Sequence, residues 1–284
     1  MMETRLSSAS KEVVISGVKQ TVFIGERINP TGKKKLAEAL KSGDYEKIIR
    51  REAREQVAAG ADILDVNVGA GGVDEVALLP EVLKMVMDEV DVPLCIDSGN
   101  PYAIEAALKV YKGKPLINSV KGEESSLQKV LPLVKEYGAA VIALTLDDNG
   151  IPKDVDSRMK VVDKIIERCV KIGIPVEDII VDCLALSVGV DNNAGLVTLE
   201  TIKKVNEKYG VNITLGASNI SFSLPGREVI NNAFLPIAVA AGLTCPIVDV
   251  AKVRKSIMAT DLILGRDKFA MRYIKYFRQN KDLF

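Results

Sequence analysis

The stretch Ala140-Val141-Ile142-Ala143-Leu144 is a short apolar run, residues 157–171 form an amphipathic segment, and Ile179-Ile180-Val181 is the next apolar run. Apolar runs of this length are typical of buried strands, and the spacing of apolar residues between them is typical of a surface helix. The segment from residue 140 to residue 181 therefore predicts a strand, a helix and a second strand.

The same unit recurs along the whole chain. Eight apolar runs occur, at residues 22–24, 63–66, 93–96, 115–117, 140–144, 179–181, 213–215 and 246–248. Helix-like segments follow them, at residues 44–59, 75–90, 101–110, 125–136, 157–171, 199–208, 227–241 and 253–264. Eight units of about 32 residues each predict an α/β fold of one domain, a (β/α)8 TIM barrel, over residues 21–284.

An open, doubly wound sheet is the alternative α/β fold. Such a sheet more often carries a G-x-G-x-x-G turn after its first strand, and Gly25-Glu26-Arg27-Ile28-Asn29 is not such a turn. Residues 1–20 precede the first barrel strand as an N-terminal extension. Within them Val13-Val14-Ile15 and Val18, with Gly17 at a turn, predict a hairpin at the barrel floor.

The composition excludes several classes of function. The chain carries 38 Lys and Arg against 38 Asp and Glu, so it lacks the basic surplus that binds nucleic acid or an acidic membrane. It has no histidine, and therefore no imidazole base, no histidine metal ligand and no Ser-His or Cys-His dyad. The cysteines show no C-x-x-C spacing, so we expect no metal on this chain; they are Cys95, Cys169, Cys183 and Cys245.

The N-terminus shows no apolar signal segment, and no run reaches the roughly 18 apolar residues of a membrane span. Together with unpaired cysteines, this predicts a soluble cytoplasmic protein with no membrane partner.

Polar side chains follow the apolar runs, where a barrel builds its active site. They are Glu26, Asn29, Asn67, Asp97, Ser98, Asn118, Ser119, Thr145, Asp147, Asp182, Ser218, Asn219 and Asp249. A single such residue often caps a helix or bonds a loop, but a whole ring of them indicates a binding surface. A carboxylate accepts two parallel N–H bonds from an aminopyrimidinone edge, and amides read the remaining ring nitrogens. The ring therefore predicts a pterin-type site and suits phosphate poorly.

Five ordered motifs give a specific resemblance that covers residues 21 to about 265. They are residues 25–29 (Gly-Glu-Arg-Ile-Asn), 64–69 (Leu-Asp-Val-Asn-Val-Gly), 95–98 (Cys-Ile-Asp-Ser), 117–119 (Ile-Asn-Ser) and 215–221 (Leu-Gly-Ala-Ser-Asn-Ile-Ser). In these motifs the chain resembles the pterin-binding methyltransferases. This family includes the methyltetrahydrofolate:corrinoid protein methyltransferases and the folate module of cobalamin-dependent methionine synthase.

The resemblance implies roles for individual residues. Asp97, Asn118 and Asp182 would hydrogen-bond the pterin ring, and Asn219 would lie near N5, where the methyl group is carried. Three further residues would belong to the same folate-binding cavity, namely Asn67, Glu26 and Ser218.

The implied reaction moves a methyl group between N5 of tetrahydrofolate and cobalamin held by a separate corrinoid protein. A hydrogen-bonding group at N5 serves this chemistry better than a strong base, so the lack of imidazole is no handicap. Relatives are often dimers, so the resemblance also implies a homodimer.

The sequence departs from the family pattern at two places. Cys183 stands where proline is common, and residues 221–227 look closer to the methionine synthase module than to the partners of iron-sulfur corrinoid proteins. The sequence assigns no role to Arg227. It predicts Lys33-Lys34-Lys35 as a solvated loop end, with contact to an acidic folate tail as the alternative.

Two other functions stay open at this point. Dihydropteroate synthase also binds pterin through Asp and Asn, but it looks for Gly-Gly-Glu-Ser after the second strand and Ser-Arg-Lys late in the chain. Those places here read Asn67-Val68-Gly69-Ala70 and Ser218-Asn219-Ile220. A non-catalytic folate-binding module is the other, and it would bind folate without turnover.

Overall fold

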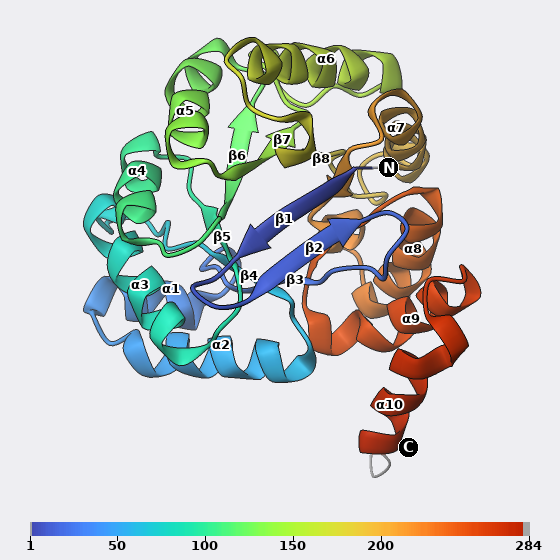
Figure 1. The fold of residues 1–284 in the computed structure, drawn as a ribbon, viewed down its shortest axis with the longest axis horizontal. Coiled ribbons are helices and arrows are strands. Elements are labelled where there is room, and N and C mark those ends of the chain that lie inside the picture. Colours follow the sequence, from blue (N-terminus) through green and yellow to red (C-terminus); the bar gives the residue numbers. More distant parts are fainter. Residues whose placement is uncertain (1, 281–284) are drawn as a thin grey trace.

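The computed structural model describes residues 2–280, and its centre is a barrel of eight parallel strands (Figure 1). The strands are β3 (Ile24–Ile28), β4 (Ile63–Val66), β5 (Leu94–Asp97), β6 (Leu116–Lys121), β7 (Ala140–Leu144), β8 (Ile179–Asp182), β9 (Asn212–Thr214) and β10 (Ile247–Val248). From β3 to β9 each strand pairs with the next along the chain, and β10 pairs with β3. A bridge between Gly216 and Ile247 joins β9 to β10, so the sheet closes and the doubly wound alternative is wrong.

Helices surround this barrel (Figure 1). They are α1 (Lys34–Ser42), α2 (Glu46–Ala59), α3 (Glu75–Glu89), α4 (Pro101–Val110), α5 (Glu124–Tyr137), α6 (Val155–Lys171), α7 (Ala194–Tyr209), α8 (Arg227–Ala241), α9 (Val250–Ile263) and α10 (Met271–Gln279). Short 3-10 turns lie at η1 (Val176–Asp178), η2 (Ala217–Ser221) and η3 (Lys268–Ala270). The predicted (β/α)8 barrel is confirmed.

Two helices were not expected from the sequence. Helix α1 buries Leu36, Ala39 and Leu40 at helical spacing, but the three lysines that open this segment suggested a loop. Helix α10 buries no residue and projects from the barrel (Figure 1). It is attached partly through Arg254, whose guanidinium lies 4.6 Å from the Tyr276 ring centroid.

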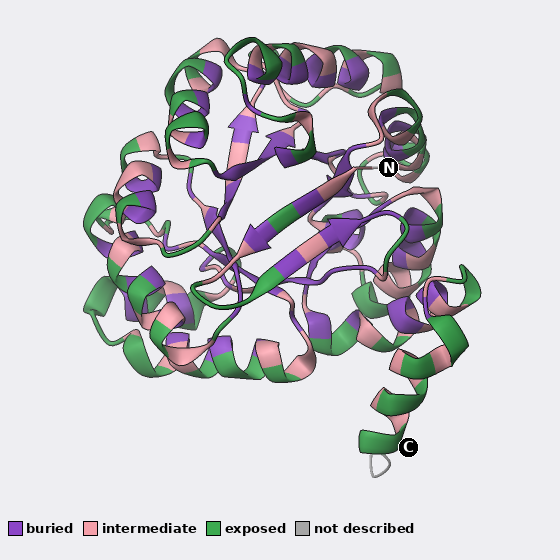
Figure 2. Cartoon of the chain, in the orientation of Figure 1, coloured by how far each residue is buried: buried purple, intermediate pink, exposed green. Residues whose placement is uncertain are grey.

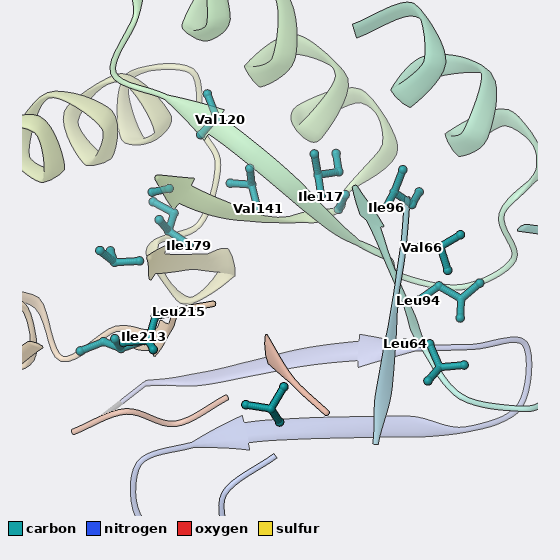
Figure 3. Close-up of a cluster of buried hydrophobic side chains, with 14 of the residues drawn as sticks. Leu64, Val66, Leu94, Ile96, Ile117, Val120, Val141, Ile179, Ile213 and Leu215 are labelled. Carbon is teal, nitrogen blue, oxygen red and sulfur yellow. The ribbon is translucent and has the colours of Figure 1, made fainter. Parts of the chain in front are cut away.

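The strands separate two apolar cores because successive side chains point to opposite sides. Outward residues such as Leu64, Ile96, Ile117 and Val141 pack beneath the helices, as part of the cluster in Figure 3. Inward residues fill the floor of the barrel; they include Ile63, Cys95, Leu116, Ile142 and Ile180. Figure 2 shows the resulting pattern, with buried strands inside a ring of helices exposed on their outer faces.

Residues 3–16 form an antiparallel pair, β1 (Glu3–Ser7) and β2 (Glu12–Ser16), that crosses the barrel (Figure 1). Leu6, Val13 and Ile15 from this pair belong to the same core as the inward residues of the floor. The pair therefore keeps water from the bottom of the barrel and leaves the opposite, C-terminal end open. The domain boundary at residue 20 stays a prediction.

Among residues 2–280, no helix is both long and apolar enough to cross a membrane.

Asn212 fastens the hairpin to the barrel, which gives a stability test. Its buried Nδ2 donates to Thr4 Oγ1 (2.9 Å) on β1 and to the Ile15 carbonyl (3.0 Å) on β2. Asn212→Ala leaves these acceptors unpaired beside a small cavity, so we expect the free energy of unfolding to fall by about 2–4 kcal/mol. Urea unfolding measures it. Asn149→Ala, at an exposed loop, is the control with a change within about 0.5 kcal/mol, and equal losses in both variants would contradict the proposed anchor.

Candidate active site

A cavity of about 630 Å³ opens at the C-terminal end of the barrel. Six of the seven predicted site residues line it: Glu26, Asp97, Asn118, Asp182, Ser218 and Asn219. They come from β3, β5, β6, β8 and the turn η2, so residues almost 200 positions apart in the sequence meet in one place. The cavity is a single polar site at the position that barrel enzymes use for catalysis.

Strand alternation aims the deepest side chains into this cavity. On β5, Cys95 points into the floor, Ile96 points outward, and Asp97 points inward again, one layer above Cys95. The same step of two residues leads from Leu116 to Asn118 and from Ile180 to Asp182. The polar layer therefore lies directly on the apolar floor, which shields it from water on one side.

One group of the site joins three neighbouring strands. Asn118 Nδ2 donates to Asp65 Oδ1 (3.1 Å), the carboxyl of Asp65 hydrogen-bonds that of Asp97, and Asn29 Nδ2 donates to Asp97 Oδ2 (3.2 Å). Burial raises the pKa of Asp97 to about 6, and burial together with the charge of Asp97 raises the pKa of Asp65 well above its ordinary value. Burial thus disfavours the ionised form of two carboxyls that lie side by side.

Asp182 stands at the end of β8 and is buried. Its Oδ1 accepts the Leu184 backbone N–H (2.7 Å), and Arg158 is the cation near it. Burial outweighs both and raises the pKa of Asp182 to about 7. This carboxyl lies in the cavity with fewer donors than an ionised group requires, which is the condition of an acceptor that a ligand completes.

The residues nearest the opening lie on η2 and its neighbours. Asn219 is exposed on this turn. Beside it, the Ser218 hydroxyl donates to Glu26 Oε1 (3.2 Å), and Arg227 Nη2 donates to the Ser218 carbonyl (2.7 Å). Burial raises the pKa of Glu26. Glu26 and Arg227 thus hold the turn that carries Asn219.

Two expectations meet a different arrangement. Asn67 is absent from the cavity lining; its Oδ1 accepts the Gly69 N–H (2.7 Å) and its side chain hydrogen-bonds Asp97 from behind. Lys33 is not a solvated loop end, because its Nζ is half-buried at the cavity and donates to the carbonyls of Glu26 (3.0 Å) and Arg27 (3.2 Å). Lys34 and Lys35 are exposed in the first turn of α1.

The sequence reasoning missed two residues that shape the site. Asp65 lies within an apolar run, and only its place two residues after the inward Ile63 reveals that it faces the cavity. Arg158 of α6 is buried, and its guanidinium donates to the carbonyls of Cys183 (2.6 Å) and Leu184 (2.8 Å), so it fixes the chain just after Asp182. Nothing in the local sequence marks an arginine of an amphipathic helix as one that points inward.

The sequence and the fold match known proteins. The pterin binding enzyme family matches residues 25–249. A methylcorrinoid:tetrahydrofolate methyltransferase of Eubacterium limosum is 32% identical over 268 residues, which cover 92% of this chain and 97% of that protein. The methionine synthase of Mycobacterium leprae is 31% identical over 264 residues; they cover 88% of this chain but 22% of that longer protein.

Among solved structures, 7,8-dihydropteroate synthase from Vibrio fischeri has a TM-score of 0.71 at 16% identity, with 93% of this chain and 99% of that chain covered. Dihydropteroate synthase from Xanthomonas albilineans in complex with 7,8-dihydropteroate has a TM-score of 0.67 at 19% identity, with 92% and 98% covered. At such identities these matches show the fold alone.

The chain belongs to the pterin-binding enzymes, as the five sequence motifs predicted. Within that family it is a methyltransferase, the class named by its relatives of more than 30% identity.

The raised pKa of Asp182 predicts a cost in stability. The carboxyl has a pKa of about 7 in the folded chain against 3.8 when solvated, so its contribution is favourable below about pH 4 and is lost as the pH rises through 7. We expect Asp182→Asn, which keeps an acceptor for Leu184, to raise the free energy of unfolding by about 1–3 kcal/mol at about pH 8 and to change little at about pH 4. Urea unfolding at both pH values measures this. Asp148→Asn, at an exposed loop, is the control; a gain that is equal at both pH values would show that the charge of Asp182 is not its cause.

Proposed function

We propose that this methyltransferase moves a methyl group between N5 of tetrahydrofolate and a methylcorrinoid carried by a separate protein. The observation that carries the proposal is the layer of hydrogen-bonding side chains that lines the cavity above its apolar floor, formed by Asp97, Asn118 and Asp182. These are the residues that the family resemblance assigns to the pterin ring.

The chemistry of this layer fits a pterin. The 2-amino group and ring N–H of a pterin resemble half a guanidinium, and a carboxylate accepts both in parallel. Asp182 has one backbone donor and a pKa raised by burial, so ligand N–H groups would supply the hydrogen bonds that the ionised carboxyl lacks. The cavity, at about 630 Å³, has room for the ring and for part of the p-aminobenzoate that extends from it.

Asn219 would act where the charge changes. When the methyl group leaves or arrives, N5 changes its charge or attacks as a free amine, and a preorganised amide stabilises that change more than it stabilises the bound ground state. Glu26 and Arg227 hold the turn of Asn219 in place, so the Asn219 amide needs little rearrangement during the reaction. The proton would pass through water and the hydrogen-bond network of the site.

The corrinoid of the partner supplies or accepts the methyl group. This chain would contribute the folate site and the open end of the barrel, where Asn219 is exposed to an approaching protein. We predict that this chain itself binds no metal and no corrinoid. The homodimer and the cytoplasmic location also remain predictions.

The direct experiment is single-turnover methyl transfer. Purified chain is mixed with methylcobalamin and tetrahydrofolate, and 5-methyltetrahydrofolate is measured. The same preparation is given a pterin diphosphate and p-aminobenzoate, and 7,8-dihydropteroate is measured. We expect the first product and not the second. Folate binding without either product would leave a non-catalytic folate module as the function.

Asp182→Ala tests the recognition of the pterin edge. Its loss removes two charge-assisted hydrogen bonds of roughly 1.5–3 kcal/mol each, so we expect tetrahydrofolate affinity to fall about 10²-fold or more. Calorimetric titration measures the affinity. Asp147→Ala is the matched control, because Asp147 also follows a barrel strand but does not line the cavity. Unchanged affinity in Asp182→Ala would remove Asp182 from the pterin site.

Asn219→Ala separates binding from chemistry. We expect kcat to fall by about 10-fold to 10³-fold, the range for one preorganised hydrogen bond, while tetrahydrofolate affinity falls less. Stability should change little, because the side chain is exposed and its loss leaves no dry cavity. Transfer at the parent rate in both directions, with folate and corrinoid saturating, would contradict the N5 assignment.

A further inference from the structure

Asp65 is the innermost polar group of the site. It is 2% exposed, it belongs to β4, and it lies behind the two residues to which the proposed function gives the pterin edge on β5 and β6. One of its oxygens accepts from Asn118 Nδ2, and its carboxyl also hydrogen-bonds Asp97. Asp65 is therefore bonded to both Asp97 and Asn118.

Two adjacent carboxyls with a hydrogen bond between them must share a proton, because two carboxylate oxygens are both acceptors. The surroundings decide which one is ionised. Asp97 is partly open to the cavity and receives donors from Asn29 and Asn67. Asp65 is enclosed and receives the Asn118 amide and the Cys95 thiol, a weak donor.

The charged and titratable groups around the two carboxyls bear on which of them is ionised. Those that face Asp65 are Asp97 and the thiol of Cys95, and burial raises the pKa of that thiol well above its usual value, so it stays neutral. Glu75, whose Oε2 accepts from Ser98 Oγ (2.6 Å), acts against an ionised Asp97, because its negative charge raises the pKa of that carboxyl; the amide donors of Asn29 and Asn67 favour the ionised form of Asp97. Neither set offers a cation to an ionised Asp65, so the single negative charge rests on the better solvated Asp97.

We propose that Asp65 is a positioning residue that stays a neutral carboxylic acid: its O–H donates to Asp97, and its carbonyl oxygen accepts from Asn118. The inference rests on the proposed pterin site. The inference adds which hydrogen-bonding groups of a ligand the site would recognise.

The consequence is a fixed pattern of donors and acceptors. The hydrogen bond that the Asp65 O–H donates keeps Asp97 deprotonated. The free lone pairs of Asp97 then face the cavity, where they accept only ligand N–H or O–H groups. The bond from Asn118 Nδ2 to Asp65 likewise prevents the amide from flipping freely, since a flipped amide would set its oxygen against the Asp65 carbonyl oxygen. Asp65 would therefore select an amino- and N–H-bearing ring edge over one that presents only acceptors.

Infrared spectroscopy of the unliganded protein tests the protonation directly. At about pH 8.5 the Asp97 and Asp182 carboxyls are ionised, with pKa values of about 6 and about 7. We expect a C=O stretch of a protonated carboxylic acid to persist at this pH, to shift on ¹³C labelling of aspartate, and to vanish in Asp65→Asn. Asp182→Asn is the control that keeps it. Absence of the band in the parent protein, or its survival in Asp65→Asn, overturns the proposal.

Binding tests the positioning role through a conservative rescue. Asp65→Asn can still donate to Asp97 and accept from Asn118, so we expect tetrahydrofolate affinity within about 10-fold of the parent. Asp65→Leu has similar size but neither hydrogen bond, so we expect a loss of at least about 10²-fold. An equal loss in both variants, with both folded by circular dichroism, overturns the proposal.

The two proposals fail separately. If no folate binds to the parent protein, the proposed function fails, but the infrared band still decides whether Asp65 is a neutral acid. If folate binds and is methylated while the band is absent, the function stands and the role of Asp65 is wrong.

Discussion

The site depends on the inward register of the barrel strands. A strand that sends Ile63, Cys95, Leu116 or Ile180 into the floor must send the residue two positions later into the layer above, and those residues are Asp65, Asp97, Asn118 and Asp182. A shift of one residue would turn each polar group toward the helices and each outward leucine or isoleucine into the cavity. The same strand register therefore builds both the apolar floor and the polar layer, and the hairpin β1–β2 contributes Leu6, Val13 and Ile15 to that floor.

Burying carboxyl groups in this layer lowers the stability of the fold, and the same burial favours the binding of a ligand with N–H donors. Three carboxyls lie above the floor, those of Asp65, Asp97 and Asp182. The cation beside Asp182 is Arg158, whose guanidinium donates to backbone carbonyls of the loop after β8. Burial raises the pKa values of Asp97 and Asp182, and a ligand with a row of N–H donors would supply hydrogen bonds that stabilise their ionised forms. The burial that destabilises these carboxyls in the free protein would therefore increase the affinity for a ring edge that carries N–H donors. A well-solvated acidic cleft would cost less to fold and would discriminate less.

The sequence predicted those parts of the fold and site whose signal lies in neighbouring residues. The eight apolar runs and their helices were enough for the barrel, and the strand ends led to Asp97, Asn118 and Asp182 because a polar residue after an apolar run is visible in one dimension. Asp65 was hidden inside such a run, where a single carboxylate looks like an interruption until the floor identifies the inward register. Arg158 was missed, and Lys33 was wrongly expected in solvent, for a different reason. Arg158 and Lys33 both donate to backbone carbonyls, and the side-chain pattern of a sequence does not show where a carbonyl acceptor lies.

Asn219 lies on a turn, whereas the residues proposed to bind the pterin ring lie on strands. Residues that recognise a rigid ring gain from rigid supports. Asp97 and Asp182 end their barrel strands, and Asn118 lies within β6. Asn219 is instead exposed on a 3-10 turn that Glu26 holds through Ser218 from within the barrel and Arg227 holds from the first turn of α8. A group that must act on the methyl-bearing nitrogen has to remain accessible to the second reactant, so it cannot be enclosed by strands. Fastening the turn by side chains leaves the amide open to the surface while its position is still fixed by the barrel, and this separates recognition at the floor from transfer at the mouth.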